Sequence, residues 1–496
     1  MGAHLNKDIS PWIAKIAGKL VSFAGKLLID RLTDDNVDNV DDKKPTPTIA
    51  QQLKNNDQSG FVLGDGVAKP EAEDGHIMVV GGAGSGKSSC IAIPSLLSWE
   101  APVFAIDIKG ELFAYSNHSP KRKILVFNPL DTDPNALGYD PYYLLKHATD
   151  KVQESQAIAH ALIPLPPNTL DPFWIQSAQN LYVGAIPYFF SRNFSFVETV
   201  TAILDTKITE LLNEIYTGDA EHARRFVSGL LDMKPQVVSS ILTVLSNHIM
   251  IFATNESVIN CLTKKINITP EDLEDGWDIY VHIPENLLKQ WKGLLTLIVS
   301  QFLNHAEKRP DMTAKPILFL LDEFARLGKL EGVVDGLATL RSKKITIAII
   351  LQSLAQLDLH YGKEARQVIA DTCQYKAVLN VTDVESQEYF SKAVGTYDKI
   401  RVVKSQQYDR FTSFKAGSAV TTLTEEKPII KPHEFATLEQ IVLLTPHGAY
   451  KADKKPYYEN TTDSTSEKTE DKGEFSENAL LKMTQNILQD KGEKNG

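Results

Sequence analysis

The stretch "HIMVVGGAGSGKSSCIAIP", residues 76–94, decides the fold of this 496-residue chain. An apolar run typical of a buried strand leads into a glycine-rich loop that fits the pattern GxxxxGK[ST], and a helical pattern follows. Backbone N–H groups of such a loop turn inward around a phosphate, and the N-terminus of the helix favours negative charge. The stretch therefore predicts a nucleotide-binding loop of nine residues: Gly81, Gly82, Ala83, Gly84, Ser85, Gly86, Lys87, Ser88 and Ser89.

Two side chains of this loop predict chemistry as well as binding. The Lys87 ammonium is placed to contact the β- and γ-phosphate oxygens of the nucleotide. The Ser88 hydroxyl is an oxygen ligand of the kind that Mg²⁺ prefers. We therefore expect Lys87 to act in catalysis and Ser88 to bind the metal ion.

A second apolar run, "ILFLLDEF" at residues 317–324, ends in two adjacent acids. We expect Asp322 to hold the water shell of Mg²⁺, and Glu323 to orient and deprotonate the attacking water. The alternative for Glu323 is that it only caps the following helix. The acid pair favours an enzyme that hydrolyses ATP with Mg²⁺ over a protein that only binds nucleotide.

Two further polar residues are candidates for catalysis. Gln352 ends the run "TIAIILQS", where it would face the γ-phosphate and report hydrolysis, unless it is a plain strand cap. Arg341, in "ATLRSKK", would stabilise transition-state charge on the nucleotide of a neighbouring subunit if it lies at a subunit edge. The alternative for Arg341 is a solvated or phosphate-contacting side chain.

The spacing of these motifs predicts a split domain. Asp322 follows Lys87 by 235 residues (322 − 87), whereas a core of this type needs about half of that or less. Apolar strands alternating with helices indicate an α/β fold with a parallel sheet covered on both faces. We expect the nucleotide-binding domain at residues 61–150 and 268–454, interrupted by an all-α domain at residues 151–267. The expected strands lie at residues 76–80, 102–107, 123–128, 277–283, 317–322, 345–350 and 375–380.

The two ends of the chain have a different composition from its middle. Residues 1–32 contain an amphipathic helix at 9–32, followed by an acidic, proline-containing linker at 33–60. Residues 455–496 form a charged tail that we expect to be disordered. The apolar face of the helix at 9–32 suits a membrane surface, a helix of a partner or the rest of this chain.

Bulk composition narrows the class of protein. The net charge of −11 argues against coating nucleic acid through bulk positive charge, although it allows a local basic channel. Cys90, Cys261 and Cys373 are far apart and lack metal-binding spacing, which indicates reduced thiols. No apolar run approaches the roughly 18–20 residues that span a bilayer, and no signal peptide is recognisable, so we expect a cytoplasmic protein.

Together, the motifs resemble the type IV secretion coupling proteins of the TraG/TraD kind, the DNA-pumping ATPases of conjugation. The phosphate loop and "LDEF" occur in many ATPases. More specific are "DIKGEL" at residues 107–112, "DPFW" at 171–174 and "LQSLAQL" at 351–357, and the resemblance covers about residues 61–458. It implies a RecA-like P-loop domain with an inserted all-α domain, usually assembled as a hexamer around a channel.

The resemblance also implies partners: DNA, the relaxase and its associated proteins, and components of the secretion channel. The loop that contains Asp107, Lys109 and Glu111 matches a loop of the family, but its spacing assigns it no chemical role. Many family members begin with transmembrane helices, whereas this chain shows only the helix at 9–32. We therefore hypothesise that a separate membrane protein recruits the chain through that helix to the cytoplasmic face of the membrane.

The main functional interpretation is a conjugative coupling ATPase that acts on DNA. The alternative is a secretion-assembly or protein-export ATPase that does not act on DNA, which would share every catalytic residue. The helical insertion, and the 80 residues before the phosphate loop, favour the coupling ATPase. A third possibility, a regulatory nucleotide-binding scaffold, is disfavoured by Glu323.

Overall fold

The computed structural model describes residue 53 and residues 59–115, 122–166, 169–312, 314–408 and 415–461. The predicted helix at 9–32, nearly all of the predicted linker and most of the predicted tail lie outside these residues. The chain divides into two compact units, Pro47–Val394 with Ile430–Gly496, and Met1–Thr46 with Gly395–Ile429. The larger unit carries a sheet and its helices, and the described part of the smaller unit is one hairpin.

A nine-stranded sheet forms the centre of the larger unit within the described ranges, in the order β13-β12-β9-β3-β8-β7-β4-β6-β5. The strands from β9 to β5 in this order all pair in parallel, and each coincides with one of the predicted apolar runs. The parallel strands are β3 (Ile77–Val80), β4 (Val103–Asp107), β5 (Lys123–Phe127), β6 (Trp277–His282), β7 (Ile317–Leu321), β8 (Ile345–Leu351) and β9 (Tyr375–Val378). β12 (Ile441–Thr445) and β13 (Gly448–Ala452) add an antiparallel edge.

One face of the sheet packs against the helical segment that follows the phosphate loop. This segment starts as the π-helix η2 (Lys87–Ala92) and continues as α2 (Ile93–Ser98). Ile91 and Leu96 of the segment share one apolar cluster with strand residues of that face. A small hairpin of β1 and β2 packs on the same helices, with bounds Gly60–Gly64 and Val67–Pro70.

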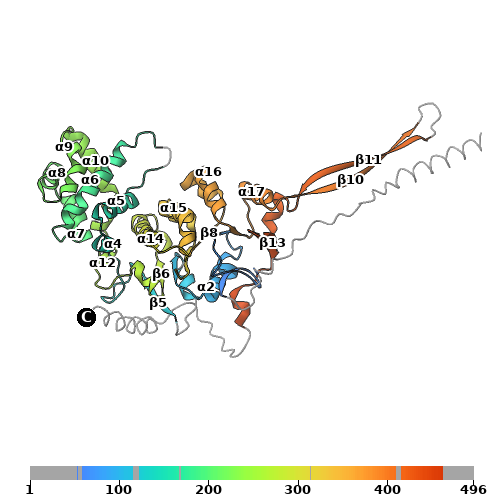
Figure 1. Ribbon diagram of the computed structural model, residues 1–496, viewed down its shortest axis with the longest axis horizontal. Coiled ribbons are helices and arrows are strands. Elements are labelled where there is room, and N and C mark those ends of the chain that lie inside the picture. The colour runs from blue at the N-terminus through green and yellow to red at the C-terminus, as the bar shows by residue number, and fades with distance from the viewer. Residues whose placement is uncertain are drawn as a thin grey trace, which may run out of the picture. The chain divides into compact units, whose positions relative to one another are not determined.

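Helices α14 (Lys292–Glu307), α15 (Glu331–Thr339) and α16 (Ala355–Thr372) cover the opposite face, as Figure 1 shows. The ring of Phe104 in β4 lies 4.7 Å from the ring of Phe302 in α14. Burial on both faces explains the continuous apolar runs and confirms the predicted α/β class. The shorter elements are α3 (Glu111–Ala114), η3 (Glu285–Leu287), η4 (Phe324–Leu327), η5 (Leu340–Lys343), α17 (Val384–Val394), η6 (Pro432–Thr437) and η7 (Tyr457–Thr461).

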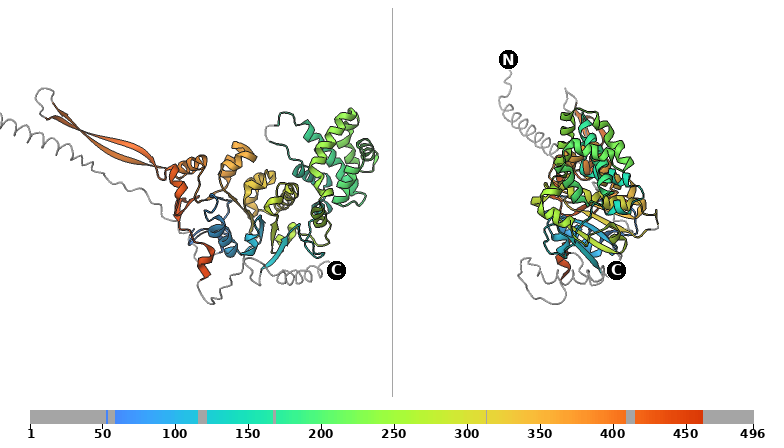
Figure 2. Two further views of the ribbon diagram at one scale, coloured as in Figure 1. Left: turned by 180° about the vertical axis from the view of Figure 1, so that it is seen from behind. Right: turned by 90° about the vertical axis from the view of Figure 1, so that its left-hand side faces the viewer.

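The chain leaves the sheet after β5 and returns in β6, and the segment between these strands is helical (Figures 1 and 2). Aromatic rings hold the helices together: Phe196 packs edge to face against both Tyr142 and Phe252. An ion pair of 2.7 Å between Lys308 and Glu154 joins this segment to α14. The segment contains α4 (Tyr143–His147), α5 (Lys151–Leu162), α6 (Phe173–Phe190), α7 (Phe196–Asp205), α8 (Ile208–Thr217), α9 (Glu221–Leu231), α10 (Pro235–Ile249), α11 (Ile251–Thr254), α12 (Glu256–Leu262) and α13 (Pro270–Glu274).

The smaller unit contains an antiparallel hairpin for which the sequence analysis assigns no strands. It pairs β10 (Thr396–Tyr408) with β11 (Lys415–Pro428), with a register irregularity near Tyr408. β10 contains an isoleucine and two valines, and β11 a valine and three threonines, β-branched residues that favour extended backbone. In neither unit does the described part of the chain contain a helix long and apolar enough to cross a membrane.

His76 lies directly before β3, at the amino-terminal edge of the sheet. Its Nδ1 accepts a hydrogen bond of 3.0 Å from the backbone N–H of Ile347 in β8, which requires a ring without a proton on Nδ1. Burial, helped by the positive charges of Lys69 and Arg341, lowers the pKa of His76 to about 4. A neutral His76 therefore ties the starts of β3 and β8 together.

We expect His76 to make the free energy of unfolding fall as the pH drops from 6.5 towards about 4. The pKa of His76 is lower in the folded chain, so the unfolded chain takes up the proton first, and each pH unit in this window costs about 1.4 kcal/mol. His76→Gln keeps an acceptor without titrating. When the pH is lowered from 7 to 5, the free energy of unfolding of this variant, measured in urea, should fall by about 2 kcal/mol less than that of the wild type.

The control for this experiment is His222→Gln, which replaces an exposed histidine of α9. It should show the same pH dependence as the wild type. Equal losses for His76→Gln and the wild type would contradict the role of His76.

Candidate nucleotide-binding and hydrolysis site

The predicted phosphate loop connects β3 to η2 at the carboxyl edge of the sheet. The N–H groups of Gly81 and Gly82 donate hydrogen bonds of 3.1 and 2.6 Å to the carbonyl oxygens of Leu351 and Asn380. These acceptors lie at or just after the ends of β8 and β9, the two strands that flank β3. Gly86 then turns the chain into the helix with a φ of 99°, in the left-handed region that favours glycine. The loop is therefore anchored to both neighbouring strands.

The Lys87 side chain folds back into this loop. Its Nζ donates to the carbonyl oxygens of Gly81 and Gly82, at 2.7 and 3.0 Å. Only 7% of the residue is exposed, and this burial lowers the pKa of Lys87, although the charges of Glu323 and Asp322 oppose the shift. The ammonium is thus held inside the loop, within reach of the electrostatic influence of the two acids.

Asp322 and Glu323 follow β7, and each is only 4% exposed. An Asp322 carboxylate oxygen accepts a hydrogen bond of 2.9 Å from the Glu323 N–H. Burial, followed by the repulsion of Glu323, raises the pKa of Asp322 to about 6. Glu323 itself has a φ of 47° and a ψ of 40°, a conformation that non-glycine residues rarely adopt and that is often found at functional sites.

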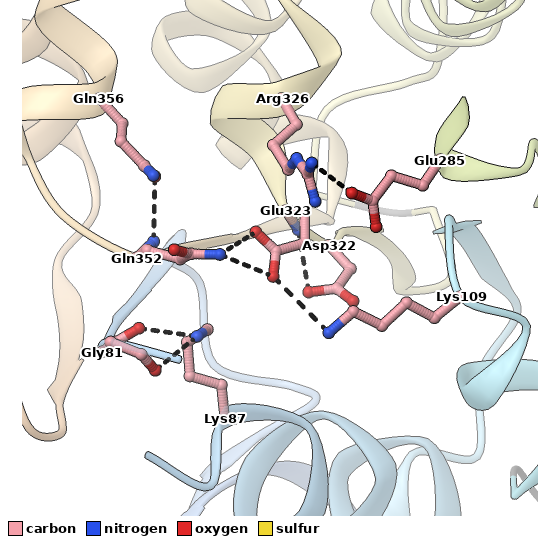
Figure 3. A network of polar contacts seen from close by, with 10 residues as sticks. Gly81, Lys87, Lys109, Glu285, Asp322, Glu323, Arg326, Gln352 and Gln356 are labelled. Carbon is pink, nitrogen blue, oxygen red and sulfur yellow. Dashed lines mark hydrogen bonds and ion pairs between the residues drawn. The ribbon is translucent and has the colours of Figure 1, made fainter. Parts of the chain in front are cut away.

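Figure 3 shows two side chains converging on the Glu323 carboxylate. The Gln352 amide, just after β8, donates to both carboxylate oxygens at 3.3 and 3.1 Å. The Lys109 ammonium, from the loop after β4, lies 3.8 Å from one of these oxygens. Because β7 lies between β8 and β4, the side chains approach Glu323 from its two flanking strands.

A third acid, Asp107, ends β4 beside β7. It is 1% exposed, and burial raises its pKa, although the N–H of Phe113 donates to one carboxylate oxygen at 2.9 Å. The ring of His282, at the end of β6, places Nδ1 2.8 Å from the Asp107 carbonyl oxygen. Asp107 also acts on Asp322 by raising its pKa, so the carboxyl edge concentrates negative charge.

Arg341 lies at the amino-terminal edge of the sheet, where the parallel strands begin. It belongs to η5, which precedes β8, and its side chain is exposed. The seven residues of β8 separate Arg341 from Gln352, a span of about 20 Å. Within one chain, Arg341 is thus remote from the phosphate loop, and its action on a neighbouring subunit stays a prediction.

The residues predicted to bind metal fit Mg²⁺. Ser88 lies in the first turn of η2, and Asp322 is a buried carboxylate at the same edge. Mg²⁺ prefers oxygen ligands and is usually held by one or two protein groups together with substrate phosphates and water. The donor set of Ser88 and Asp322 suits that pattern.

The structure thus brings together the phosphate loop, Asp322, Glu323 and Gln352, and leaves Arg341 outside. The sequence analysis assigns no chemical role to Lys109 or Asp107 and does not identify His282. A signal was present for each, since all three lie at or just after the end of an apolar strand. The contacts of these side chains could not be predicted, because local sequence patterns do not show which strands are neighbours in the sheet.

A phosphate loop after the first parallel strand, an acid pair after β7 and a glutamine after β8 define a RecA-like P-loop nucleotide-binding domain with an inserted all-α domain. The family model described as Type IV secretory system Conjugative DNA transfer matches residues 33–488. The chain belongs to this family.

Named relatives and solved structures agree with this assignment. Protein VirD4 of Agrobacterium fabrum is 25% identical over 404 residues, covering 78% of this chain and 59% of the relative. Conjugal transfer protein TraG of Escherichia coli is 24% identical over 393 residues, covering 72% and 61%. The chain thus spans about 60% of the length of these relatives. The structure of plasmid coupling protein TrwB with an ATP analogue shares the fold, with a TM-score of 0.65, 18% identity, and coverage of 83% of this chain and 93% of that one.

Gly81→Ala should weaken nucleotide binding. A Cβ at Gly81 would lie 2.5 Å from the Ser85 Oγ and 2.9 Å from the Leu379 Cβ, so the loop would have to move. We expect at least a roughly tenfold loss of affinity for a fluorescent ATP analogue, or about 1.4 kcal/mol.

The matched control is Gly229→Ala on α9, where an added Cβ meets no atom within 4 Å. This change should leave nucleotide affinity unaltered and raise the free energy of unfolding by up to about 1 kcal/mol. Unchanged affinity in Gly81→Ala would show that the loop does not hold the phosphate in this arrangement.

Proposed function

We propose that this chain is an ATPase of conjugative type IV secretion. In this proposal it recruits a relaxase–DNA complex and uses ATP hydrolysis to drive DNA through the secretion channel. The observation that carries the enzymatic part is the placement of Glu323, a buried carboxylate held by Gln352 at the edge that carries Lys87. Membership of the conjugative DNA transfer family supports the biological setting.

The proposed reaction assigns a separate task to each side chain. Lys87 exchanges its loop carbonyl contacts for the β- and γ-phosphate oxygens of ATP. Glu323 accepts a proton from water as the water oxygen bonds to the γ-phosphorus and the bond to the bridging oxygen of ADP breaks. Gln352 holds the Glu323 carboxylate in place. Through this contact it would report hydrolysis to β8, which it follows.

ATP and Mg²⁺ are the proposed ligands. TrwB, which shares this fold, has been solved with the ATP analogue ADPNP and with ADP and Mg²⁺. In this chain, the loop from Gly81 to Ser89 would bind the phosphates, and Ser88 and Asp322 would hold the metal ion. Mg²⁺ would supply positive charge to the phosphate oxygens.

DNA contacts must be local in a chain with a net charge of −11. Binding through a few lysine and arginine side chains releases counterions and is therefore sensitive to salt. DNA, the relaxase proteins and the secretion channel components are the partners that family membership supports. We also propose that the chain works at the cytoplasmic face of the membrane, recruited by a membrane protein through residues 9–32.

The active form is proposed to be a homo-hexamer in which Arg341 serves the adjacent subunit. Arg341 is exposed and lies at the edge of the sheet opposite to its own phosphate loop. A ring that places this edge against the carboxyl edge of the next subunit would bring Arg341 to that subunit's nucleotide. An arginine there would stabilise the charge of the transition state.

Steady-state ATP hydrolysis, with and without single- and double-stranded DNA, tests the proposed function. Lys87→Ala and Glu323→Gln should each lower kcat by at least roughly a hundredfold, because they remove the phosphate contact and the base. DNA should stimulate the wild type at low salt, and the stimulation should fall as salt rises. Hydrolysis that DNA never stimulates would favour a secretion-assembly or protein-export ATPase instead.

Mixing two inactive variants tests whether Arg341 acts between subunits. Lys87→Ala chains keep Arg341, and Arg341→Ala chains keep a complete phosphate loop. Each variant alone should be at least roughly tenfold less active than the wild type, while their mixture should regain part of the activity at concentrations that favour assembly. A mixture no more active than its components would rule out this role.

A further inference from the structure

The loop after β4 brings a second lysine to the nucleotide site. Gly110, with a φ of 74°, turns this loop between the end of β4 and α3. Lys109 lies just before the turn, and Figure 3 shows its side chain extending towards the acids after β7. Its Nζ ends 3.8 Å from a Glu323 carboxylate oxygen.

The charge of Lys109 acts on both halves of the site. It lies within electrostatic range of Asp322 on one side and of Lys87 on the other. Lys87 is the residue assigned to the β- and γ-phosphates, and Glu323 to the attacking water. Because Lys109 contacts Glu323, the residue assigned to the attacking water, we place it on the γ-phosphate side of the loop.

The side chains of two arginines do not pair with the acids after β7. Arg326, in the segment after Glu323, forms an ion pair with Glu285 instead (Figure 3). Arg341 of the same chain lies at the opposite edge of the sheet. Among the residues that the structure describes, Lys109 thus adds an ion pair with Glu323 itself to the cation that Lys87 supplies in the phosphate loop.

The contact between Lys109 and Glu323 is suited to exchange. The Lys109 side chain is 41% exposed, whereas that of Glu323 is 5% exposed and is also held by Gln352. The separation of 3.8 Å is too long for a hydrogen bond, and Gln352 still holds Glu323 when the ammonium moves away. The lysine ammonium is a compact charge with three donors on a flexible stem, and a γ-phosphate offers it more negative charge than one carboxylate.

We propose that Lys109 is a catalytic cation of this site, which binds a γ-phosphate oxygen of ATP in exchange for Glu323. The exchange neutralises charge on the transferring phosphoryl group and frees the Glu323 carboxylate to take the proton of the attacking water. Glu323 passes this proton to the departing phosphate, and the ammonium then returns to the regenerated carboxylate. This inference rests on the proposed ATP hydrolysis, since it requires ATP in the phosphate loop.

Binding of diphosphate and triphosphate nucleotides by Lys109→Gln tests the inference. The variant should bind ADP within about twofold of the wild type, because only the γ-phosphate contact is lost. It should bind a non-hydrolysable ATP analogue at least roughly tenfold more weakly and lower kcat roughly 10- to 100-fold. Lys109→Arg, which keeps the charge, should recover much of the triphosphate affinity.

Lys207→Gln provides the matched control. Lys207 forms an exposed ion pair of 3.7 Å with Glu210 on α8, similar in length to the Lys109 pair but outside the site. Its loss should leave both nucleotide affinities and kcat unchanged. Thermal melting of each variant checks that the fold is retained.

A second background separates phosphate binding from simple support of Glu323. In Glu323→Gln, Lys109 has no carboxylate partner at this position. If Lys109 binds the γ-phosphate, adding Lys109→Gln there should still weaken the triphosphate analogue roughly tenfold and leave ADP unaffected. If Lys109 only positions Glu323, the added change should alter neither affinity.

The outcomes distinguish this inference from the proposed function. A wild type that hydrolyses ATP, with Lys109→Gln equal to it in kcat and in triphosphate affinity, overturns the role of Lys109 and leaves the ATPase intact. Equal weakening of ADP and the triphosphate analogue also overturns it, because the defect then lies in the loop. A wild type that binds neither nucleotide overturns both.

Discussion

Parallel hydrogen bonding between neighbouring strands is the constraint on which the rest of this structure depends. Val80 pairs with Leu351, and Leu321 pairs with Ile349, so β3, β8 and β7 end at nearly the same level. Whatever follows these strands must share one edge of the sheet. That edge therefore receives the phosphate loop, the acid pair and the glutamine, although they come from distant parts of the chain. The backbone register, rather than any contact between these polar side chains, assembles the site.

The same register concentrates charge that the protein has to offset. Asp107, Asp322 and Glu323 meet almost without exposure to water, and burial raises the pKa of the first two. Lys87 and Lys109 supply the opposing charge, one from within the phosphate loop and one from the rim of the site. Perturbed carboxyl groups of this kind often mark sites tuned for catalysis rather than for stability. A ligand that brings both phosphate oxygens and a divalent cation is suited to such a balance.

The helical insertion lies between two strands that are neighbours in the sheet. β5 and β6 are paired neighbours, so the chain can leave and return without disturbing the register of the strands that carry the site. The insertion still contacts the core, as the ion pair between Lys308 and Glu154 shows. It can therefore differ in size or surface while the edge that carries the nucleotide site stays intact. The insertion accounts for the long spacing between Lys87 and Asp322 in the sequence.

The sequence by itself determined the apolar strands, the phosphate loop, the acid pair and Gln352, because each is a local pattern of a few residues. It also indicated that a helical segment separates two halves of one domain. Only the tertiary structure decided that Lys109 meets Glu323, that His282 contacts Asp107, and that Arg341 lies at the far edge of the sheet. The hairpins of β1–β2 and β10–β11 likewise gave no decisive local signal. The physical reason is that periodicity reports burial, whereas strand order is set by pairing between remote segments: β7 lies beside β4, although it begins 210 residues after β4 ends (317 − 107).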